Sequence, residues 1–290
     1  MMGAIAPSRR LQWVSAVEHR NFSALQALQE AMAEWYSSCG DYYQTIDFTR
    51  DNWISDPIYR WIADVAQAAQ NILEIGCGRA NLLLHHRHLA SRYTGVDFSQ
   101  DLIGANSQRF PEAKFHPIRT AGVLDCQTEQ FDLVIAIFVV EHCVFPQLAL
   151  DEWIRVLKSG GLLLILCPDF LGRGLMSSQR VGFSEGTGRE KLFRGKFADA
   201  LVTALDTRIR MPIKAMLCRY KAKRRPRFFI NLAPTCFTDS FRPDVDAVYL
   251  TYEPEICSWV DGKISFNPLP NELRRHVRAH RLLAINGKKI

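Results

Sequence analysis

A short glycine turn is the first part of this sequence whose residues could do chemistry. It lies in "NILEIGCGRAN", residues 71–81, where Gly76 and Gly78 follow a short apolar run. Glycine lacks a Cβ, so the backbone can bend sharply there and present its N–H groups to a ligand. A pyrophosphate-binding G-x-G-x-x-G motif needs a third glycine, and Asn81 stands at that position. This departure disfavours an NAD or FAD site and leaves other nucleotides open.

Two acidic residues flank the turn. Glu74 lies inside the apolar run just before it, and Asp97 ends the next predicted strand. A carboxylate is costly in a buried strand unless it is paired, which favours a ligand-related network around Glu74. An acidic residue about 20 residues beyond such a turn can accept hydrogen bonds from ribose hydroxyls. Both residues also have a structural interpretation, because Asp97 could cap the next helix and Glu74 could hold N–H groups of the turn.

Strands and helices alternate around this turn. Short apolar strands are predicted at 72–75, 92–98, 113–118, 131–139 and 160–168. Apolar residues at helical spacing predict helices at 21–38, 57–69, 81–90, 99–110 and 146–157. Asp56 with Pro57 marks the start of the second of these helices, and Ser99 caps the fourth. Near-continuous apolar strands separated by helices indicate an α/β protein whose parallel sheet is covered on both faces. Ligands of such a doubly wound sheet bind beyond the carboxyl ends of its strands, where the glycine turn is expected.

Four segments, in this order and spacing, then carry a family resemblance. They are "LEIGCGRANLLLHH", "YTGVDFSQDLI", "FDLVIAIFVVEH" and "VLKSGGLLLILCPD". Over about residues 70–170 the chain resembles the class I S-adenosylmethionine-dependent methyltransferases, especially the type 11 branch. The resemblance implies a Rossmann-like, mostly parallel seven-stranded sheet and S-adenosylmethionine as cofactor. It also implies a final antiparallel strand hairpin, which we predict at 227–233 and 247–252.

The same resemblance suggests which residues hold the cofactor. Its methionine part would lie against the glycine-turn motif, Glu74, Gly76, Cys77 and Gly78. Asp97 would accept hydrogen bonds from both ribose hydroxyls, and Phe98 would lie beside the adenine. Where the family usually has an acidic residue near the adenine amino group, this chain has Thr120. The Thr120 side chain or the backbone of Ala121 would serve there instead.

The fourth predicted strand ends in "FVVEHC", so Phe138, Glu141 and His142 should emerge beside the transferred methyl group. An imidazole exchanges protons near neutral pH, which makes His142 the candidate base for an acceptor that must lose a proton. The alternative is that Glu141 and His142 cap the strand and pack against the methionine end of the cofactor. Asp169, just past the fifth strand, is a further candidate for the substrate pocket.

The chain divides into four predicted parts. They are a helical cover and substrate lid at 1–70, a cofactor-binding core at 71–168, a basic insertion and lid at 169–225, and a final strand hairpin with a basic helix at 226–290. The basic helix is predicted over "NELRRHVRAHRLLA", residues 271–284. Tyr42, Tyr43 and Trp53 make the region before the first strand aromatic, which suits contact with an organic substrate. Most aromatic residues of this kind merely pack, so that alternative stays open.

Charge separates the two halves of the chain. Residues 1–170 contain 13 Lys or Arg and 19 Asp or Glu, whereas residues 171–290 contain 23 and 11. The stretch "RYKAKRRPR" at 219–227 could bind an anionic small molecule, an acidic protein or RNA, or it could be a solvated face. A small-molecule partner is the main expectation, with nucleic acid as the alternative.

Histidines and cysteines complete the candidate chemistry. "HHRH" at 85–88 cannot turn all three of its histidines to one side of a helix. His276 and His280 have suitable spacing but no Cys partner in the sequence around them, so we predict no metal site. The eight cysteines are scattered without a C-x-x-C pair, and no apolar run approaches the roughly 20 residues that span a bilayer. A cytoplasmic protein without a secretory signal is therefore expected.

The combined prediction is a methyltransferase that transfers a methyl group in line to an oxygen or nitrogen of a small molecule. Two alternatives remain: an RNA or protein methyltransferase with the same cofactor site, and a non-catalytic scaffold that kept the fold.

Overall fold

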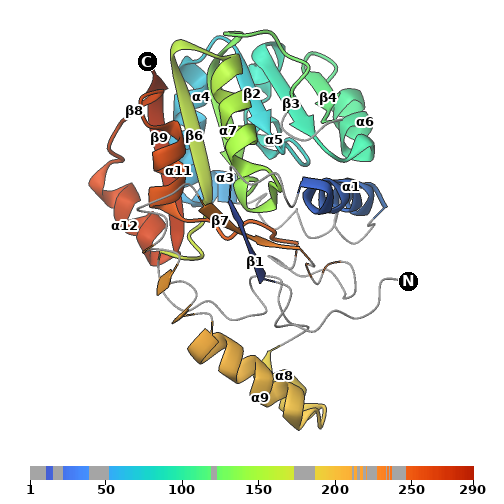
Figure 1. The fold of residues 1–290 in the computed structure, drawn as a ribbon. Helices are drawn as coiled ribbons and strands as arrows, with labels where there is room; N and C mark the ends of the chain where they lie inside the picture. The colour runs from blue at the N-terminus through green and yellow to red at the C-terminus, as the bar shows by residue number, and fades with distance from the viewer. Residues whose placement is uncertain are drawn as a thin grey trace.

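The computed structural model describes residues 11–15, 22–38, 52–118, 123–172, 187–210 and 246–290, together with 212–213, 216–217, 220, 227–232, 234 and 236. A seven-stranded sheet organises this part of the chain (Figure 1). Its strands are β2 (Ile72–Ile75), β3 (Tyr93–Asp97), β4 (Lys114–Pro117), β5 (Phe131–Ile137), β6 (Leu157–Pro168), β8 (Ile264–Phe266) and β9 (Leu282–Lys289).

The strand order is β4-β3-β2-β5-β6-β9-β8. The first five strands in this order are parallel, and β9 is antiparallel to both of its neighbours, β6 and β8. The order reverses between β2 and β5, which is where a doubly wound sheet forms its ligand crevice. The predicted mostly parallel, seven-stranded α/β sheet is thus confirmed.

Helices bury both faces of the sheet. One hydrophobic cluster joins the sheet to α4 (Pro57–Ala68), α5 (Asn81–His85), α6 (Gln100–Arg109) and α12 (Asn271–Ala279). The other joins it to α1 (Phe22–Ser38), α7 (Pro146–Val156) and α11 (Glu253–Val260). Within β5, Leu133 and Ile135 belong to the first cluster, whereas Val134 and Ala136 belong to the second. This alternation is the period of two that a strand imposes on its side chains.

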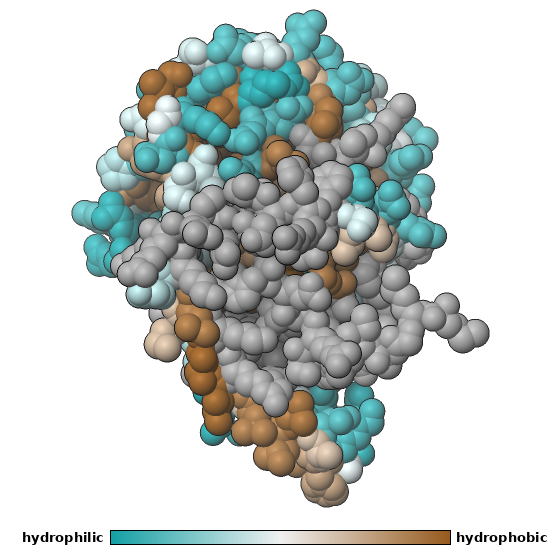
Figure 2. All heavy atoms as spheres, viewed as in Figure 1, coloured by the Kyte–Doolittle hydropathy of each residue, from teal (hydrophilic) through white to brown (hydrophobic). Residues whose placement is uncertain are grey.

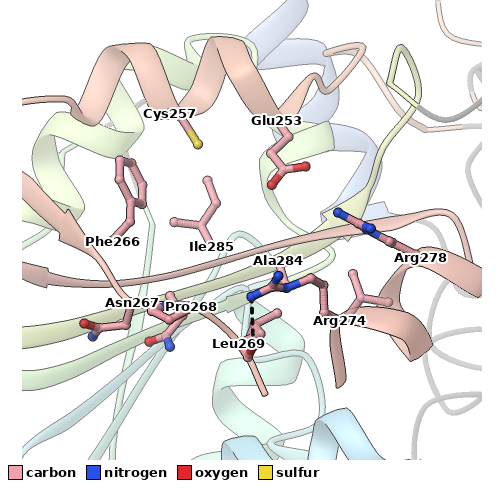
Figure 3. Close-up of a pocket in the computed structure, with 12 residues that line it drawn as sticks. Glu253, Cys257, Phe266, Asn267, Pro268, Leu269, Arg274, Arg278, Ala284 and Ile285 are labelled. Carbon is pink, nitrogen blue, oxygen red and sulfur yellow. Dashed lines mark hydrogen bonds between the residues drawn. The ribbon is translucent and has the colours of Figure 1, made fainter. Parts of the chain in front are cut away.

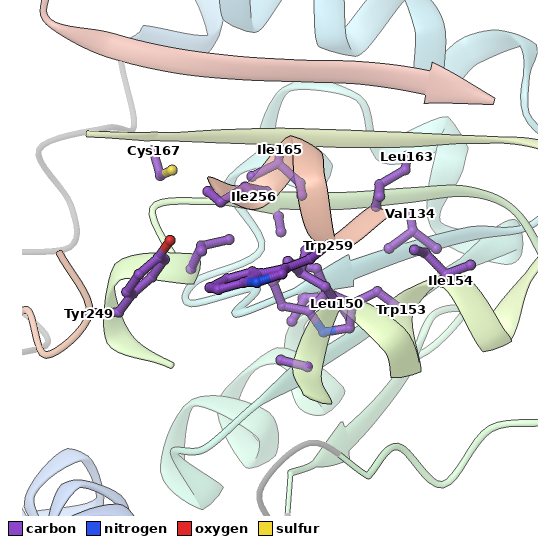
Figure 4. Packing of buried hydrophobic residues seen from close by; sticks show 14 of the residues in the cluster. Val134, Leu150, Trp153, Ile154, Leu163, Ile165, Cys167, Tyr249, Ile256 and Trp259 are labelled. Atoms are coloured by element: carbon purple, nitrogen blue, oxygen red, sulfur yellow. The ribbon is translucent and has the colours of Figure 1, made fainter. Parts of the chain in front are cut away.

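Aromatic residues fill much of the second cluster. Trp153 of α7 and Trp259 of α11 lie against the sheet, with Tyr249 next to Trp259 at a ring separation of 5.7 Å (Figure 4). Large rings contribute much buried apolar area each, so they dominate the packing of α7 and α11. On the same side, α1 lies beside the carboxyl end of β3 (Figure 1).

Helix starts follow the predicted capping residues. The Asp56 carboxylate accepts a hydrogen bond from the Ile58 N–H at 2.8 Å and caps α4, and the Ser99 hydroxyl accepts one from the Leu102 N–H and caps α6. Asp56 also lies 3.0 Å from His276 Nε2, which ties α12 to the start of α4. The helix predicted at 81–90 is instead divided at His86 into α5 and a 3-10 helix, η4 (Arg87–Arg92).

The predicted positions of the last two strands are wrong. β7 (Arg227–Asn231) pairs with β1 (Leu11–Ser15) in a separate two-stranded sheet, and Tyr249 makes only an isolated bridge to Ile230. The antiparallel pair of the main sheet is β8 and β9, and β9 includes residues that were predicted to continue the C-terminal helix. That helix ends at Ala279, and Arg281, with φ +57°, turns the chain into β9. None of the helices described has the length and apolar character that crossing a membrane requires.

A buried acidic residue in α11 makes stability depend on pH. Glu255 Oε2 accepts a hydrogen bond from the Tyr249 hydroxyl at 2.7 Å. Burial raises the pKa of Glu255 from 4.5 to about 8, although that hydrogen bond acts in the opposite direction. The folded state therefore keeps this proton over a range in which the unfolded chain loses it. The free energy of unfolding consequently falls as pH rises from about 4.5 to about 8.

We expect Glu255→Gln to reduce this pH-dependent loss of stability by on the order of 3 kcal/mol, because glutamine has no proton to lose. Urea denaturation at about pH 5 and about pH 8.5 measures the effect. Glu272→Gln, at an exposed position in the first turn of α12, is the matched control. It should leave the change of the free energy of unfolding with pH as it is in the parent chain. If the free energy of unfolding of Glu255→Gln still falls by the full amount between these two pH values, the Glu255 carboxyl group does not cause the pH dependence.

Candidate functional site

The glycine turn connects β2 to α5 at the carboxyl end of the sheet. Gly76 and Gly78 have φ angles of +62° and +50°, and Ala80 has φ +52°. The Cys77 N–H donates to the Val96 carbonyl at 3.0 Å, which fixes the turn to β3. A left-handed backbone is unfavourable for any residue with a Cβ, so Ala80 holds local strain. The third left-handed residue is therefore Ala80 rather than Asn81, the position that comparison with the pyrophosphate motif had singled out.

Asp97 holds this turn from the end of β3. Its Oδ2 accepts a hydrogen bond from the Gly78 N–H, and its Oδ1 accepts one from the Ser99 N–H, both at 2.9 Å. From α6, Asn106 donates to the Gly78 carbonyl at 2.7 Å. Burial raises the pKa of Asp97, whereas the N–H groups of Ser99 and Gly78 act against that rise. Asp97, rather than Glu74, therefore holds an N–H group of the turn, and the cap of α6 is Ser99 rather than Asp97.

Glu74 has a different partner. The Tyr93 hydroxyl donates to Glu74 Oε2 at 2.5 Å, and both side chains are buried beneath the turn. Burial raises the pKa of Glu74 to about 7, the Tyr93 hydrogen bond lowers it, and the nearby charge of Asp97 raises it. Burial also raises the pKa of the Cys77 thiol well above its ordinary value, which favours the neutral thiol over the thiolate.

The end of β5 lies against the glycine turn. The Phe138 N–H donates to the Leu166 carbonyl at 2.7 Å, and Phe138 has φ +55°, a rare conformation for a bulky residue. The next residue, Val139, places Cγ2 2.5 Å from the point where a Cβ on Gly76 would stand. Strained backbone of this kind concentrates at functional sites. The structure thus brings the segment that contains Phe138 next to the turn.

His142 belongs to a polar cluster at the same end of the sheet. It ends the short helix η5 (Val140–His142), and its Nδ1 lies 3.2 Å from the carbonyl oxygen of Asp246 and 3.4 Å from Asp246 Oδ2. The Tyr36 hydroxyl of α1 donates to the same Oδ2 at 2.8 Å. The ring of Tyr36 lies 6.4 Å from that of Phe98 and 6.2 Å from that of His142. Tyr36 therefore connects the residue after Asp97 with His142.

These contacts select one tautomer of His142. A carbonyl oxygen can only accept a hydrogen bond, so the neutral ring carries its proton on Nδ1 and a lone pair on Nε2. The side chain is 22% exposed, whereas that of Asp246 is 4% exposed. Nε2 is consequently the atom that can take a proton, while Asp246 fixes the ring from its buried side.

Three other predicted site residues have identifiable surroundings. Glu141 is fully buried; its carbonyl accepts hydrogen bonds from the N–H groups of residues 248 and 249, and Oε1 lies 3.9 Å from His142 Nε2. Trp53, in α3 (Asn52–Ser55), is buried in the core with its ring 5.1 Å from that of Tyr59. The carboxylate of Asp169 is buried and accepts the Gly172 N–H at 2.9 Å.

The remaining predicted residues, Tyr42, Tyr43, Thr120 and Ala121, lie outside the residues that the structure describes. Most of the basic stretch 219–227 does so as well. Their expected roles therefore stay predictions.

Sequence reasoning missed three residues that support the site. Asn106 shares the buried face of α6 with Leu102 and Ile103, and Tyr36 continues the apolar stripe of α1. A polar group at a buried helical position needs a partner, so both could have been found from their spacing. Asp246 follows no local pattern, and only the fold brings it to His142.

Figure 3 shows a cavity lined by residues of the C-terminal part of the chain. Its volume is about 310 Å³, and α11, α12 and β9 form its walls. Glu253, Arg274 and Arg278 contribute charged side chains, and Arg274 donates a hydrogen bond to the Leu269 carbonyl at 3.3 Å. None of the predicted site residues lines it, so its chemistry is separate from that of the glycine turn.

Gly76 should tolerate no side chain. In Gly76→Ala the new Cβ would meet Val139 and would have to adopt a left-handed backbone. We expect the free energy of unfolding to fall by about 1–3 kcal/mol, the usual cost of overpacking a core. Thermal or urea denaturation measures this loss.

Gly104→Ala provides the matched control. Gly104 lies in α6, and no atom lies within 4 Å of the position its Cβ would take. Alanine in a helix interior should raise the free energy of unfolding by about 0.5–1 kcal/mol. Equal effects of the two substitutions would contradict the close approach of Val139 to the turn.

The residues at this end of the sheet fit the chemistry of the implied cofactor. The Asp97 carboxylate accepts the N–H groups of Gly78 and Ser99 on its two oxygens, and the Phe98 N–H also favours its charged form. Two carboxylate oxygens together have capacity for about four donors. Asp97 can therefore still accept hydrogen bonds from a ribose diol. The half-buried aromatic ring of Phe98 follows it directly and offers a flat apolar surface to a purine.

Comparison with known proteins relates this chain to methyltransferases. Residues 73–165 match a family model described as "Methyltransferase domain". The chain is similar to phosphatidylethanolamine N-methyltransferase from Cereibacter sphaeroides, with 29% identity over 125 residues, 41% of this chain and 61% of the relative. It is also similar to a ubiquinone biosynthesis O-methyltransferase from Chelativorans sp. (strain BNC1), with 27% identity over 55% of this chain and 64% of the relative.

Among solved structures, magnesium protoporphyrin IX methyltransferase from Synechocystis PCC 6803 aligns over 90% of this chain and 100% of its own, with 12% identity and a TM-score of 0.48. The chain spans slightly less than two thirds of the length of the two curated relatives named above, 61% and 64%.

Proposed function

We propose that this chain is an S-adenosylmethionine-dependent methyltransferase that methylates an oxygen or nitrogen atom of a small-molecule acceptor. The match of residues 73–165 to a methyltransferase-domain model supports the reaction class. One observation supports this most directly: the Tyr36 ring lies 6.4 Å from the ring of Phe98, the residue after Asp97, and 6.2 Å from the ring of His142. A candidate nucleoside site and a candidate base therefore lie at the same end of the sheet. The relatives' names describe one N-methyltransferase and one O-methyltransferase, which agrees with this class of acceptor.

The glycine turn and the end of β3 would hold the cofactor. S-adenosylmethionine, when bound, supplies an electrophilic methyl group. Asp97 would accept hydrogen bonds from the ribose hydroxyls, and Phe98 would lie against the adenine. Gly76 and Gly78 leave the turn without side chains, and Glu74 with Tyr93 supports it from below. These residues contribute mainly by positioning, because alignment of two reactants can supply most of the acceleration in such a transfer.

His142 would act on the acceptor. Its Nε2 lone pair would remove the proton from a hydroxyl as the new bond to the methyl carbon forms and the carbon–sulfur bond breaks. With a protonated amine it would remove the proton beforehand, which frees the nitrogen lone pair for attack. Asp246 fixes the ring through Nδ1, and the Tyr36 hydroxyl in turn holds the Asp246 carboxylate. Asp246 and Tyr36 are thus positioning residues, and they stabilise the imidazolium that results from the proton transfer.

Two measurements, made one after the other, test the proposal. Isothermal titration with S-adenosylmethionine should show saturable binding, and no binding at millimolar cofactor would favour a non-catalytic scaffold. Transfer of a radiolabelled methyl group is then compared for phenols, primary amines, carboxylic acids, bulk RNA and an acidic protein. Labelling of only RNA or protein would contradict a small-molecule acceptor while preserving the cofactor assignment.

A further inference from the structure

The helical hairpin formed by α8 (Gly188–Phe193) and α9 (Phe197–Leu205) gathers apolar side chains on its surface. It continues into a π-helix, η6 (Asp206–Arg210), and extends away from the main sheet (Figure 1). Eleven of the sixteen exposed large hydrophobic residues found in the described structure lie between 192 and 220. Figure 2 shows these hydrophobic residues as a patch at the lower end of the molecule. Such a concentration marks an interaction surface rather than scattered exposure.

The hairpin has almost no core of its own. Within α8 and α9, Ala200 and Thr203 are the buried residues described, whereas Phe193 is 92% exposed, Phe197 70% and Leu201 63%. The two helices enclose a largely apolar groove of about 570 Å³. Packing within the hairpin therefore leaves its large side chains in water.

Basic residues are interleaved with these apolar side chains. Residues 187–220 contain eight Lys or Arg and three Asp or Glu, a net charge of +5. At the tip, exposed Arg194 and Lys196 lie between Phe193 and Phe197 in sequence. Gly195, with φ +71°, reverses the chain there, so the two rings and two cations occupy one end of the hairpin.

We propose that this hairpin docks on the surface of a membrane that contains anionic lipids. Phe193 and Phe197 enter the boundary between headgroups and acyl chains, while Arg194 and Lys196 bind lipid phosphates. Lysine is depleted from the cores of protein interfaces, so its presence among the apolar residues favours a lipid surface over a protein partner. Helices of six and nine residues are too short to cross the bilayer, so the hairpin lies on it.

Vesicle co-sedimentation of the full chain without S-adenosylmethionine tests the proposal independently of methyl transfer. One set of vesicles contains phosphatidylcholine, and the other contains equal parts of phosphatidylcholine and phosphatidylglycerol. The chain should bind the anionic vesicles preferentially, and salt should weaken that binding. Phe193→Asp with Phe197→Asp should lower the partition coefficient on the order of tenfold or more. Arg194→Glu with Lys196→Glu should lower it on the order of tenfold or more on anionic vesicles alone.

Matched controls replace residues of the same kind elsewhere. Ile54→Asp with Leu148→Asp changes two exposed apolar positions, and Lys114→Glu with Arg275→Glu changes two exposed basic ones. Both should bind vesicles as the parent chain does, and circular dichroism verifies that every variant folds. The proposal is overturned if the parent chain ignores anionic vesicles, or if the Phe193 and Phe197 substitutions leave binding unchanged. Loss of a self-associated dimer in those variants, without vesicle binding by the parent, would identify a second copy as the occupant instead.

Discussion

A His142→Ala variant is expected to bind S-adenosylmethionine as the parent chain does but to transfer methyl groups about 10²–10⁴ times more slowly, the usual contribution of a general base. The reason lies in the tautomer that the Asp246 carbonyl imposes, which leaves Nε2 as the proton acceptor. The effect should appear in kcat for a hydroxyl acceptor, because only the proton-transfer step is lost. Steady-state kinetics with a phenol from the acceptor panel, together with titration calorimetry of the cofactor, separates the two quantities.

His88→Ala is the matched control for this experiment. His88 is exposed on η4, outside the site, and its replacement should leave kcat unchanged. The pH profile supplies a second criterion, since the acid limb due to a protonated imidazole should disappear in His142→Ala and persist in His88→Ala. Unchanged kcat in both variants would mean that His142 only caps β5 and packs, the alternative that the sequence left open.

The parts of the fold that local chemistry determines could be predicted from the sequence. Asp56 with Pro57 marked the start of α4, and Ser99 marked the start of α6, because capping involves neighbouring residues only. The apolar strands β2 and β5 were equally clear, since a strand buried on both faces needs a continuous apolar run.

The prediction of the last two strands was wrong because pairing between residues far apart in sequence, and not local composition, determines them. Residues 227–233 and 247–252 are rich in aromatic and β-branched residues, whereas β9 contains Gly287 and two lysines. What places β9 in the sheet is its antiparallel register with β6, such as Ile285 opposite Ile165, and that pairing is 120 residues away in sequence. Gly287 was the available signal, because a Cβ there would stand 2.3 Å from Ile264 Cγ2 in β8. A glycine inside a strand often marks such a close approach.

The candidate site likewise has residues that the sequence could predict and residues that only the fold brings together. Gly76, Asp97 and His142 follow strands at the carboxyl edge of the sheet, so their proximity could be inferred from the α/β order alone. Asp246, the partner of His142, could not be predicted in this way. The Tyr36 hydroxyl that holds Asp246 is 210 residues away from it in sequence. The structure therefore adds the residues that orient the chemistry to those that were expected to perform it.

An Asp97→Ala variant should lose both cofactor affinity and stability. Removing a charged acceptor costs about 1.5–3 kcal/mol in hydrogen bonds, so the dissociation constant for S-adenosylmethionine should rise about 10- to 100-fold. The same change leaves the Gly78 and Ser99 N–H groups without their carboxylate, which should lower the free energy of unfolding by about 1–3 kcal/mol. Calorimetry and urea denaturation on one preparation measure the two losses separately.

The comparison of these two losses distinguishes the interpretations of Asp97. Asp97→Asn can still accept a hydrogen bond through its amide oxygen, so it should recover much of the stability while binding the cofactor weakly. Asp101→Ala, at an exposed position in the first turn of α6, should leave the affinity for the cofactor unchanged. If Asp97→Ala loses stability and keeps full affinity, the carboxylate serves only to hold the glycine turn. The ribose would then have to be bound by other residues, because removing a carboxylate that accepts hydrogen bonds from its hydroxyls would weaken cofactor binding.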